Sequence, residues 1–285
     1  MALGAEVGGP LISVIIPTWK EDESTLRPCL TSLFAQSLPK SLYEVIIVNY
    51  SPREDQGLKR LTEEFRERGL RVKLVTINEE GIGKARNLGV RASSRSVKYL
   101  VFIGADDRLS KGLLEATLRL YVSNPYLVAI RYRVRPVIKR LKGFKWALVR
   151  LLEEVNMNLL PMLLINLFKR YYLPGWLFSC RRRAFETVGG FSEDCNVGED
   201  TELGLKLGRC RIIGVKGDEP VLSKDDEGVR PLVAFVSGRY WGEVGSKGLW
   251  LGVMGCLACY VTYWAEEVRR RLLGRRVWRV RTVRL

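Results

Sequence analysis

Residues 11–19 read LISVIIPTW, a short run of β-branched and other apolar residues interrupted by a proline near its end. Such a run predicts a strand that is buried on both faces. Residues 43–51, YEVIIVNYS, repeat the pattern. Between the two, residues 23–36 place leucines and a phenylalanine at helical spacing, and Ser24 or Thr25 could cap the helix start. The whole segment predicts a βαβ unit.

The alternation continues to residue 134. The expected helices are 55–68, 83–93 and 111–123, and the expected strands are 70–78, 97–107 and 126–134. Repeated alternation of this kind predicts an α/β fold, with a mostly parallel sheet covered by helices on both faces. Ligands of such sheets bind beyond the carboxyl ends of the strands, so the polar residues at those ends are the candidates for a site.

Two stretches in the second half of the chain depart from the alternation. An apolar helical stretch with basic flanks, about 137–174, indicates an insertion, after which the α/β pattern returns. A second apolar run covers 249–264 and precedes an arginine-rich tail. We therefore expect a ligand-binding α/β domain over 1–235 and an apolar helical C-terminal appendage over 236–285.

The composition excludes several kinds of chemistry. The chain of 285 residues contains no histidine, which rules out histidine triads, histidine zinc sites and imidazole bases. Acid–base catalysis must then rest on carboxylates. The six cysteines are scattered, unlike those of a disulfide scaffold. Cys256 and Cys259 form a CxxC inside an apolar run without a second pair, so we interpret them as packing residues and assign no metal to them.

A net charge of +16 indicates an anionic partner: a phosphorylated substrate, an anionic lipid surface or nucleic acid. No nucleic-acid partner is expected, because no helix-turn-helix, zinc-finger or RNA-recognition signature is present. The apolar run 249–264 would extend about 24 Å as a helix, against roughly 30 Å for a bilayer core. With aromatic residues near its ends, it predicts a helix in the plane of an anionic membrane surface. The alternative is that it packs on the sheet.

The first residues of the chain, MALGAEVGG, lack a basic segment ahead of an apolar core and do not resemble a secretory signal. We therefore expect the α/β domain to lie on the cytoplasmic face of the cell membrane.

Five segments occur in the order and at the separations of one enzyme family: SVIIPTWKEDE, EVIIVNYSP, GIGKARNLGV, YLVFIGADD and GGFSEDCNVGEDTELGLKLGR. Together they resemble the inverting family 2 glycosyltransferases, which have the GT-A fold, over about residues 12–214. The resemblance implies that the domain 1–235 is catalytic and moves a sugar, with inversion, from a nucleotide-diphosphate sugar to a lipid-linked or glycan acceptor. The alternative is a non-catalytic relative that serves as a membrane scaffold or binds a nucleotide.

The resemblance places five residues against the donor: Thr18, Glu21, Asn49, Gly83 and Arg86. Asn49 stands where the family commonly has an aspartate that contacts the base. An amide can also bond to a base, and a turn role is the alternative. Gly83 permits close backbone approach, and Arg86 would lie beside the pyrophosphate. The alternative for Arg86 is a surface position on its helix.

Asp106 and Asp107 end the strand expected at 97–107. The resemblance assigns Asp106 to the donor and to a divalent cation, Mg²⁺ or Mn²⁺, which would neutralise charge on the leaving diphosphate. The family usually has Asp-x-Asp here, and Gly104 replaces the first acid. Helix capping is the alternative for both aspartates and weighs most for Asp107.

Many members of the family complete the metal site with a histidine after the sheet, and this chain has Lys224 near that position. Three alternatives remain. Asp225 or Asp226 replaces the histidine, water replaces it, or Lys224 itself neutralises the diphosphate and the metal requirement is weak.

Glu199 and Asp200 resemble the Glu-Asp pair that starts the acceptor-side helix of the family. The resemblance assigns Asp200 as the catalytic base that takes the proton of the acceptor hydroxyl. The alternative is a capping role, because acids favour the first turn of a helix.

Overall fold

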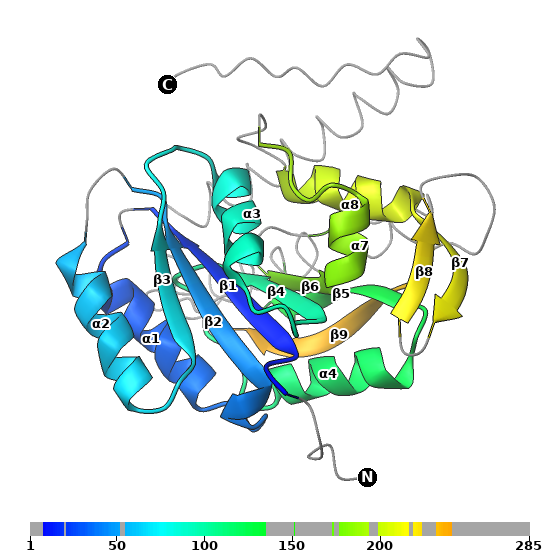
Figure 1. Cartoon of the computed structure of the whole chain (residues 1–285). Coiled ribbons are helices and arrows are strands. Elements are labelled where there is room, and N and C mark those ends of the chain that lie inside the picture. The colour runs from blue at the N-terminus through cyan, green and yellow to red at the C-terminus, as the bar shows by residue number, and fades with distance from the viewer. Residues whose placement is uncertain are drawn as a thin grey trace.

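The structure, a computed structural model, describes residues 8–19, 21–51, 55–134, 151, 173, 177–193, 199–216, 219–223 and 232–240. Its centre is a seven-stranded sheet with the order β3-β2-β1-β4-β6-β5-β9 (Figure 1). The strands are β1 (Ile12–Thr18), β2 (Tyr43–Asn49), β3 (Val72–Thr76), β4 (Tyr99–Ile103), β5 (Leu127–Val134), β6 (Leu177–Arg181) and β9 (Leu232–Tyr240). A separate two-stranded sheet joins β7 (Arg211–Lys216) to β8 (Glu219–Ser223).

The sheet is mostly parallel, as the sequence predicts. Strands β1 to β4 run parallel to one another, and β9 runs parallel to β5. Only β6 is antiparallel to its neighbours β4 and β5 among the strands of this sheet that the structure describes. The carboxyl ends of β1, β2, β3 and β4 therefore share one edge, and that edge carries the polar residues singled out from the sequence.

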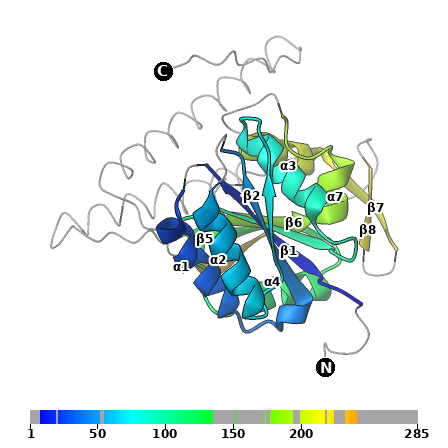
Figure 2. The same ribbon diagram turned by 60° about the vertical axis from the view of Figure 1, so that its left-hand side comes forward.

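Helices cover both faces of the sheet (Figures 1 and 2). One face carries α1 (Glu23–Phe34), α2 (Gln56–Glu67) and α4 (Leu113–Ser123), and the other carries α3 (Ile82–Ala92), α7 (Arg182–Thr187) and α8 (Glu199–Arg209). A short 3₁₀ helix, η1 (Lys40–Leu42), precedes β2. Two separate clusters of buried apolar side chains fill the two interfaces between helices and sheet. The arrangement confirms the predicted α/β fold.

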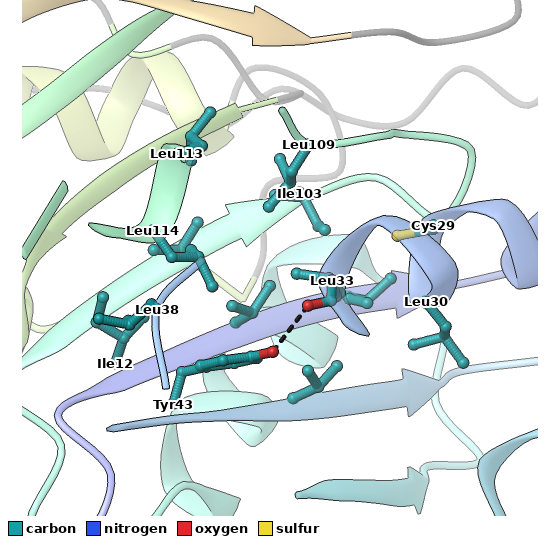
Figure 3. Packing of buried hydrophobic residues seen from close by; sticks show 14 of the residues in the cluster. Ile12, Cys29, Leu30, Leu33, Leu38, Tyr43, Ile103, Leu109, Leu113 and Leu114 are labelled. Carbon is teal, nitrogen blue, oxygen red and sulfur yellow. Dashed lines mark hydrogen bonds between the residues drawn. The ribbon is translucent and has the colours of Figure 1, made fainter. Parts of the chain in front are cut away.

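Figure 3 shows the core between the sheet and α1 and α4. The ring of Tyr43 is fully buried there, and its hydroxyl donates a hydrogen bond to the carbonyl oxygen of Leu33 at 2.7 Å. A buried hydroxyl without a partner would destabilise the fold, so this bond allows a tyrosine to stand among leucines and isoleucines.

The cap of α1 differs from the expected one. Asp22 is the N-cap residue, and its Oδ1 accepts a hydrogen bond from the backbone N–H of Thr25 at 2.9 Å. The hydroxyl of Ser24 donates to the same carboxylate. The expectation that Ser24 or Thr25 caps this helix is therefore wrong, because the carboxylate of Asp22 accepts the hydrogen bond at the helix start.

Strands β8 and β9 were not expected from the sequence. Strand β9 extends to Tyr240, so the domain boundary expected at residue 235 falls inside a strand of the main sheet. Apart from residues 151 and 173, the expected insertion at 137–174 lies outside the described residues, as does the apolar run 249–264. None of the helices in the described part of the chain is long and apolar enough to cross a membrane.

Candidate active site

Thr18 and Asn49 stand side by side at the carboxyl ends of β1 and β2, where the strand register pairs them. The Thr18 side chain is fully buried, and its hydroxyl donates to the carbonyl oxygen of Val48 at 3.4 Å. Asn49 is also buried, and its Oδ1 accepts from the backbone N–H of Ser51 at 3.1 Å. The side chain of Asn49 thus shapes the turn after β2, which fits the turn role. Its contact with a nucleotide base stays a prediction.

An aromatic pair follows the same two strands. The rings of Trp19 and Tyr50 lie 4.9 Å apart between centroids and are tilted by 32°. Burial raises the pKa of the Tyr50 hydroxyl, the carboxylates of Glu21 and Glu199 raise it further, and the guanidinium of Arg86 lowers it. The charged side chains that act on the pKa of Tyr50 thus come from distant parts of the sequence.

Neither Trp19 nor Tyr50 was assigned a role from the sequence. The available signal was their position, because each directly follows the last residue of a buried parallel strand, Thr18 or Asn49.

Glu21 belongs to the same group of charges. Its carboxylate accepts a hydrogen bond from the backbone N–H of Trp19. Burial raises the pKa of Glu21, and the nearby carboxylate of Asp106 raises it further. The loop after β1 and the turn after β4 therefore bring two acids toward each other at one edge of the sheet.

The turn after β4 explains the glycine that replaces the family's first acid. The backbone N–H of Gly104 donates to Oδ2 of Asp107 at 2.7 Å. A Cβ atom at residue 104 would lie only 2.9 Å from Oδ1 of Asp106 and 3.1 Å from Oδ2 of Asp107. A side chain there would force the two carboxylates to move, so glycine fits this turn best.

The two aspartates of the turn differ in exposure. Asp106 is exposed, whereas Asp107 is buried, and its pKa is raised well above the ordinary value by burial and by the charge of Asp106. The capping alternative does not hold for either residue, because α4 begins at Leu113 and its N-cap residue is Gly112. Asp106 is therefore the carboxylate of this turn that a ligand can reach.

The carboxylate oxygens at this edge of the sheet fit a divalent cation that also binds to a substrate. No cluster of three or more His, Cys, Asp or Glu side chains arranged to hold a metal ion occurs in the described ranges. One exposed carboxylate, that of Asp106, matches the way Mg²⁺ is commonly bound, through one or two carboxylates, phosphate oxygens and water. Lys224, Asp225 and Asp226 lie outside the described residues.

Arg86 is buried at 2% exposure and forms an ion pair with Glu199, with 2.6 Å between Nη1 and Oε1. Its guanidinium also lies over the ring of Phe191, 5.2 Å from the centroid. The surface alternative for Arg86 is therefore wrong. Its contact with a pyrophosphate stays a prediction, and Glu199 is a partner that the structure gives it.

Helix α3 also contacts the loop before α8. A Cβ atom at Gly83 would lie 2.7 Å from the carbonyl oxygen of Ser192, so the close approach that this glycine permits is to that loop. Asn87 holds the same loop through Nδ2, which donates to the carbonyl oxygen of Phe191 at 2.9 Å, and through Oδ1, which accepts from the N–H of Phe191 at 3.1 Å. A donor contact of Gly83 stays a prediction.

No role was assigned to Asn87 from the sequence, where it lies in the segment GIGKARNLGV. Its signal was its place beside Arg86 in a helix that starts at the carboxyl edge.

Asp200 is the second residue of α8 and is therefore not its N-cap residue. Its neighbour Glu199 is buried and paired with Arg86, whereas Asp200 is only half-buried. Because Glu199 pairs with Arg86 of α3, and α3 packs against β1 and β2, the start of α8 lies on the same face of the sheet as α3. The structure thus gathers Thr18, Glu21, Asn49, Arg86 and Asp106 in one region and places Asp200 next to Glu199.

The carboxyl edge of the sheet thus presents the exposed carboxylate of Asp106 and strand-end groups beside an aromatic pair, and the start of α8 presents the half-buried carboxylate of Asp200. The sequence profile of the family described as Glycosyl transferase family 2 matches residues 13–189, more than half of the chain.

Curated relatives are similar over part of this region. Glycosyltransferase AglE of Haloferax volcanii is 33% identical over 98 residues, which are 34% of this chain and 31% of the relative. Poly(ribitol-phosphate) beta-N-acetylglucosaminyltransferase TarS of Staphylococcus aureus is 32% identical over 104 residues, 36% of this chain and 17% of the relative. The matched regions thus span about a third or less of these relatives.

Solved structures share the fold. A mannosyltransferase, PcManGT from Pyrobaculum calidifontis, in complex with GDP-Man and Mn²⁺, superimposes with a TM-score of 0.63 at 18% identity and covers 92% of this chain and 65% of that one. S. aureus TarS 1–349 in complex with UDP-GlcNAc gives a TM-score of 0.57 at 19% identity and covers 82% and 59%. At these identities the similarity shows a common GT-A architecture.

Proposed function

Since the chain belongs to glycosyl transferase family 2, we propose that it transfers a sugar from a nucleotide-diphosphate sugar to a glycan or lipid-linked acceptor, with inversion. One observation carries the proposal. The buried pair of Arg86 and Glu199 joins the start of α8, with Asp200, to α3, which packs against β1 and β2.

The donor would lie across the carboxyl ends of β1, β2 and β4. Thr18 and Asn49 would border the base, beside the rings of Trp19 and Tyr50. The exposed carboxylate of Asp106 would face the diphosphate and hold Mg²⁺ or Mn²⁺ there. A bound cation supplies positive charge to the diphosphate oxygens as the bond to the sugar breaks. The metal in the Pyrobaculum calidifontis complex supports this part of the proposal.

The acceptor would approach from the side of α8. Asp200 would take the proton of its hydroxyl while that oxygen attacks the anomeric carbon from the side opposite the leaving nucleoside diphosphate. The new glycosidic bond then has the inverted configuration. Glu199 cannot easily serve as the base, because its carboxylate is buried and already paired with Arg86.

Hydrolysis of donors tests the proposal directly. The full chain is incubated with UDP- and GDP-sugars, with Mn²⁺, with Mg²⁺ and with chelator, and release of the nucleoside diphosphate is measured. Release of a diphosphate from at least one donor is expected, with a rate that rises when the cation is present. A chain that binds nucleoside diphosphates without turning over any donor would contradict the enzymatic function.

The proposal extends to the cell membrane. The apolar run 249–264 and the arginine-rich tail support attachment to an anionic membrane surface with the catalytic domain on the cytoplasmic face. A lipid-linked acceptor would then reach the enzyme by diffusion in the membrane plane.

A further inference from the structure

Helix α3 holds the loop that leads into α8. Asn87 exchanges two hydrogen bonds with the backbone of Phe191, and Gly83 lets the carbonyl oxygen of Ser192 approach the helix closely. The backbone of Phe191 and Ser192 is therefore held against α3.

Helix α8 reaches back to the same loop. The ammonium of Lys206 donates to the carbonyl oxygen of Gly190 at 3.2 Å and to Oγ of Ser192 at 3.0 Å. The hydroxyl of Ser192 in turn donates to Oε1 of Glu202 at 2.7 Å. These bonds link the body of α8 to the loop, whereas the first residue of α8 is linked directly to α3 through the pair of Glu199 and Arg86.

The ion pair of Arg86 and Glu199 is buried, and burial of a charge costs free energy because the charge loses its hydration. The side chains of Arg86 and Glu199 are only 3% and 8% exposed. A buried ion pair contributes little net stability compared with apolar residues of the same volume, because both charges lose their hydration. What such a pair does supply is a defined geometry, since a carboxylate and a guanidinium accept few relative orientations.

We propose that Arg86 and Glu199 are positioning residues that fix the start of α8, and with it the adjacent Asp200, relative to the donor-side helix α3. This assignment rests on the proposed glycosyl transfer, in which Asp200 is the base. A positioning role differs from a contact between Arg86 and the donor. If the two residues position α8, a change at either one should lower turnover and leave donor binding nearly unchanged.

The test compares four variants of the full chain. Arg86→Lys and Glu199→Gln each disturb the pair, and the double variant removes it from both sides. Arg91→Gln is the matched control, because Arg91 lies on the same helix and pairs with Glu193 at 3.5 Å on the surface, with 60% and 46% exposure. Thermal unfolding selects the variants that fold, and Glu199→Asp replaces Glu199→Gln if the latter does not.

Three quantities are measured for each variant: the Kd of the nucleoside diphosphate that the wild type binds, the kcat and KM of donor hydrolysis, and hydrogen exchange of the α8 amides. Each single variant should lower kcat by about 10- to 100-fold, because a shift of about 1 Å at a catalytic group can cost that much. The Kd should change less than about threefold. The double variant should lower kcat no further than the more impaired of the two single variants, because both changes break one interaction.

A different result is expected if Arg86 is a ligand of the sugar donor and has no positioning role. A Kd weakened by tenfold or more in Arg86→Lys, with Glu199→Gln unchanged, would overturn the proposal and place Arg86 at the diphosphate. Unchanged kcat in both folded single variants would overturn it as well. A wild-type chain that turns over no donor would contradict the proposed function and the positioning of a base. Exchange at the start of α8 would still show whether Arg86 holds that helix.

Discussion

Two adjacent acids at the start of α8 have different surroundings. Glu199 is buried against Arg86, and Asp200 is half-buried beside it. Asp200→Asn should lower turnover by ~10²-fold or more and leave donor affinity nearly unchanged, because the amide keeps the shape of the side chain and cannot accept a proton. Turnover and donor Kd are measured on one preparation, with the exposed Glu186→Gln as control. Asp200 is not the base if the variant keeps more than about a tenth of wild-type turnover.

Gly104 stands where the family pattern Asp-x-Asp has its first acid, and a substitution can introduce that acid. Gly104→Asp should weaken donor binding and lower the unfolding temperature, because a Cβ atom there crowds the carboxylates of Asp106 and Asp107. Gly112→Asp is the control, since a Cβ at Gly112 meets nothing within 4 Å. Calorimetric titration of a nucleoside diphosphate with Mn²⁺, together with melting curves, measures both effects. Tighter binding in Gly104→Asp would show that the turn relaxes to admit a second acid.

Single residues also show where prediction from sequence stops. The carboxyl-edge positions of Thr18, Asn49 and Asp106 follow from strand patterns alone, because parallel strands end together. The pair of Arg86 and Glu199 could not be predicted, because 113 residues separate them and no local pattern couples them. The segment GIGKARNLGV indicated that Arg86 matters, and only the structure shows that Arg86 of α3 pairs with Glu199 of α8.

Among the elements, β6 and α4 are joined by one buried cation. Arg181 is fully buried, and its guanidinium donates to the carbonyl oxygens of Leu127, Tyr121 and Asn124 at 2.8 to 3.2 Å. Two of these carbonyls lie at the end of α4, where a positive charge also complements the helix dipole.

Arg181→Met should lower the free energy of unfolding by ~2 kcal/mol or more, because it leaves buried carbonyl groups without their donor. Arg119→Met, on the exposed side of α4, should change it by only about 0.5 kcal/mol. Urea unfolding followed by circular dichroism measures both. An equal loss of unfolding free energy in the two variants would show that the buried guanidinium of Arg181 stabilises the fold no more than the exposed one of Arg119.

The elements themselves were largely predictable to the end of β5. Buried strands such as β1 and β2 stand out as apolar runs, and α2 stands out by its amphipathic spacing. Strand β9 was missed because its sequence, LVAFVSGRY, follows a charged stretch and has no partner pattern near it in the chain. Its partner β5 lies about a hundred residues earlier, and single-sequence patterns carry no information on pairing at that distance.

For the whole molecule, the remaining prediction concerns the last forty residues. Truncation before Gly248 should release the protein from membranes without loss of donor hydrolysis. The apolar run would bury one helical face, at ~25 cal/mol per Å², and the arginines would contact anionic headgroups. Flotation with anionic vesicles at low salt, high salt and alkaline pH compares full-length and truncated protein. Full-length protein that ignores the vesicles and stays in solution without detergent would contradict membrane attachment.

The place of β9 also has a consequence for how the chain is made. A ribosome releases the strands from the N-terminus onward, so the parallel group β3-β2-β1-β4 can assemble early, and β6 and β5 can join it next. The far edge of β5 must then wait for residues 232–240, which pair with it beginning at Leu127 and Leu232. An unpaired strand edge is a template for association with other chains. Until β9 is synthesised, the nascent protein therefore carries an unpaired edge on β5, which residues 232–240 later cover.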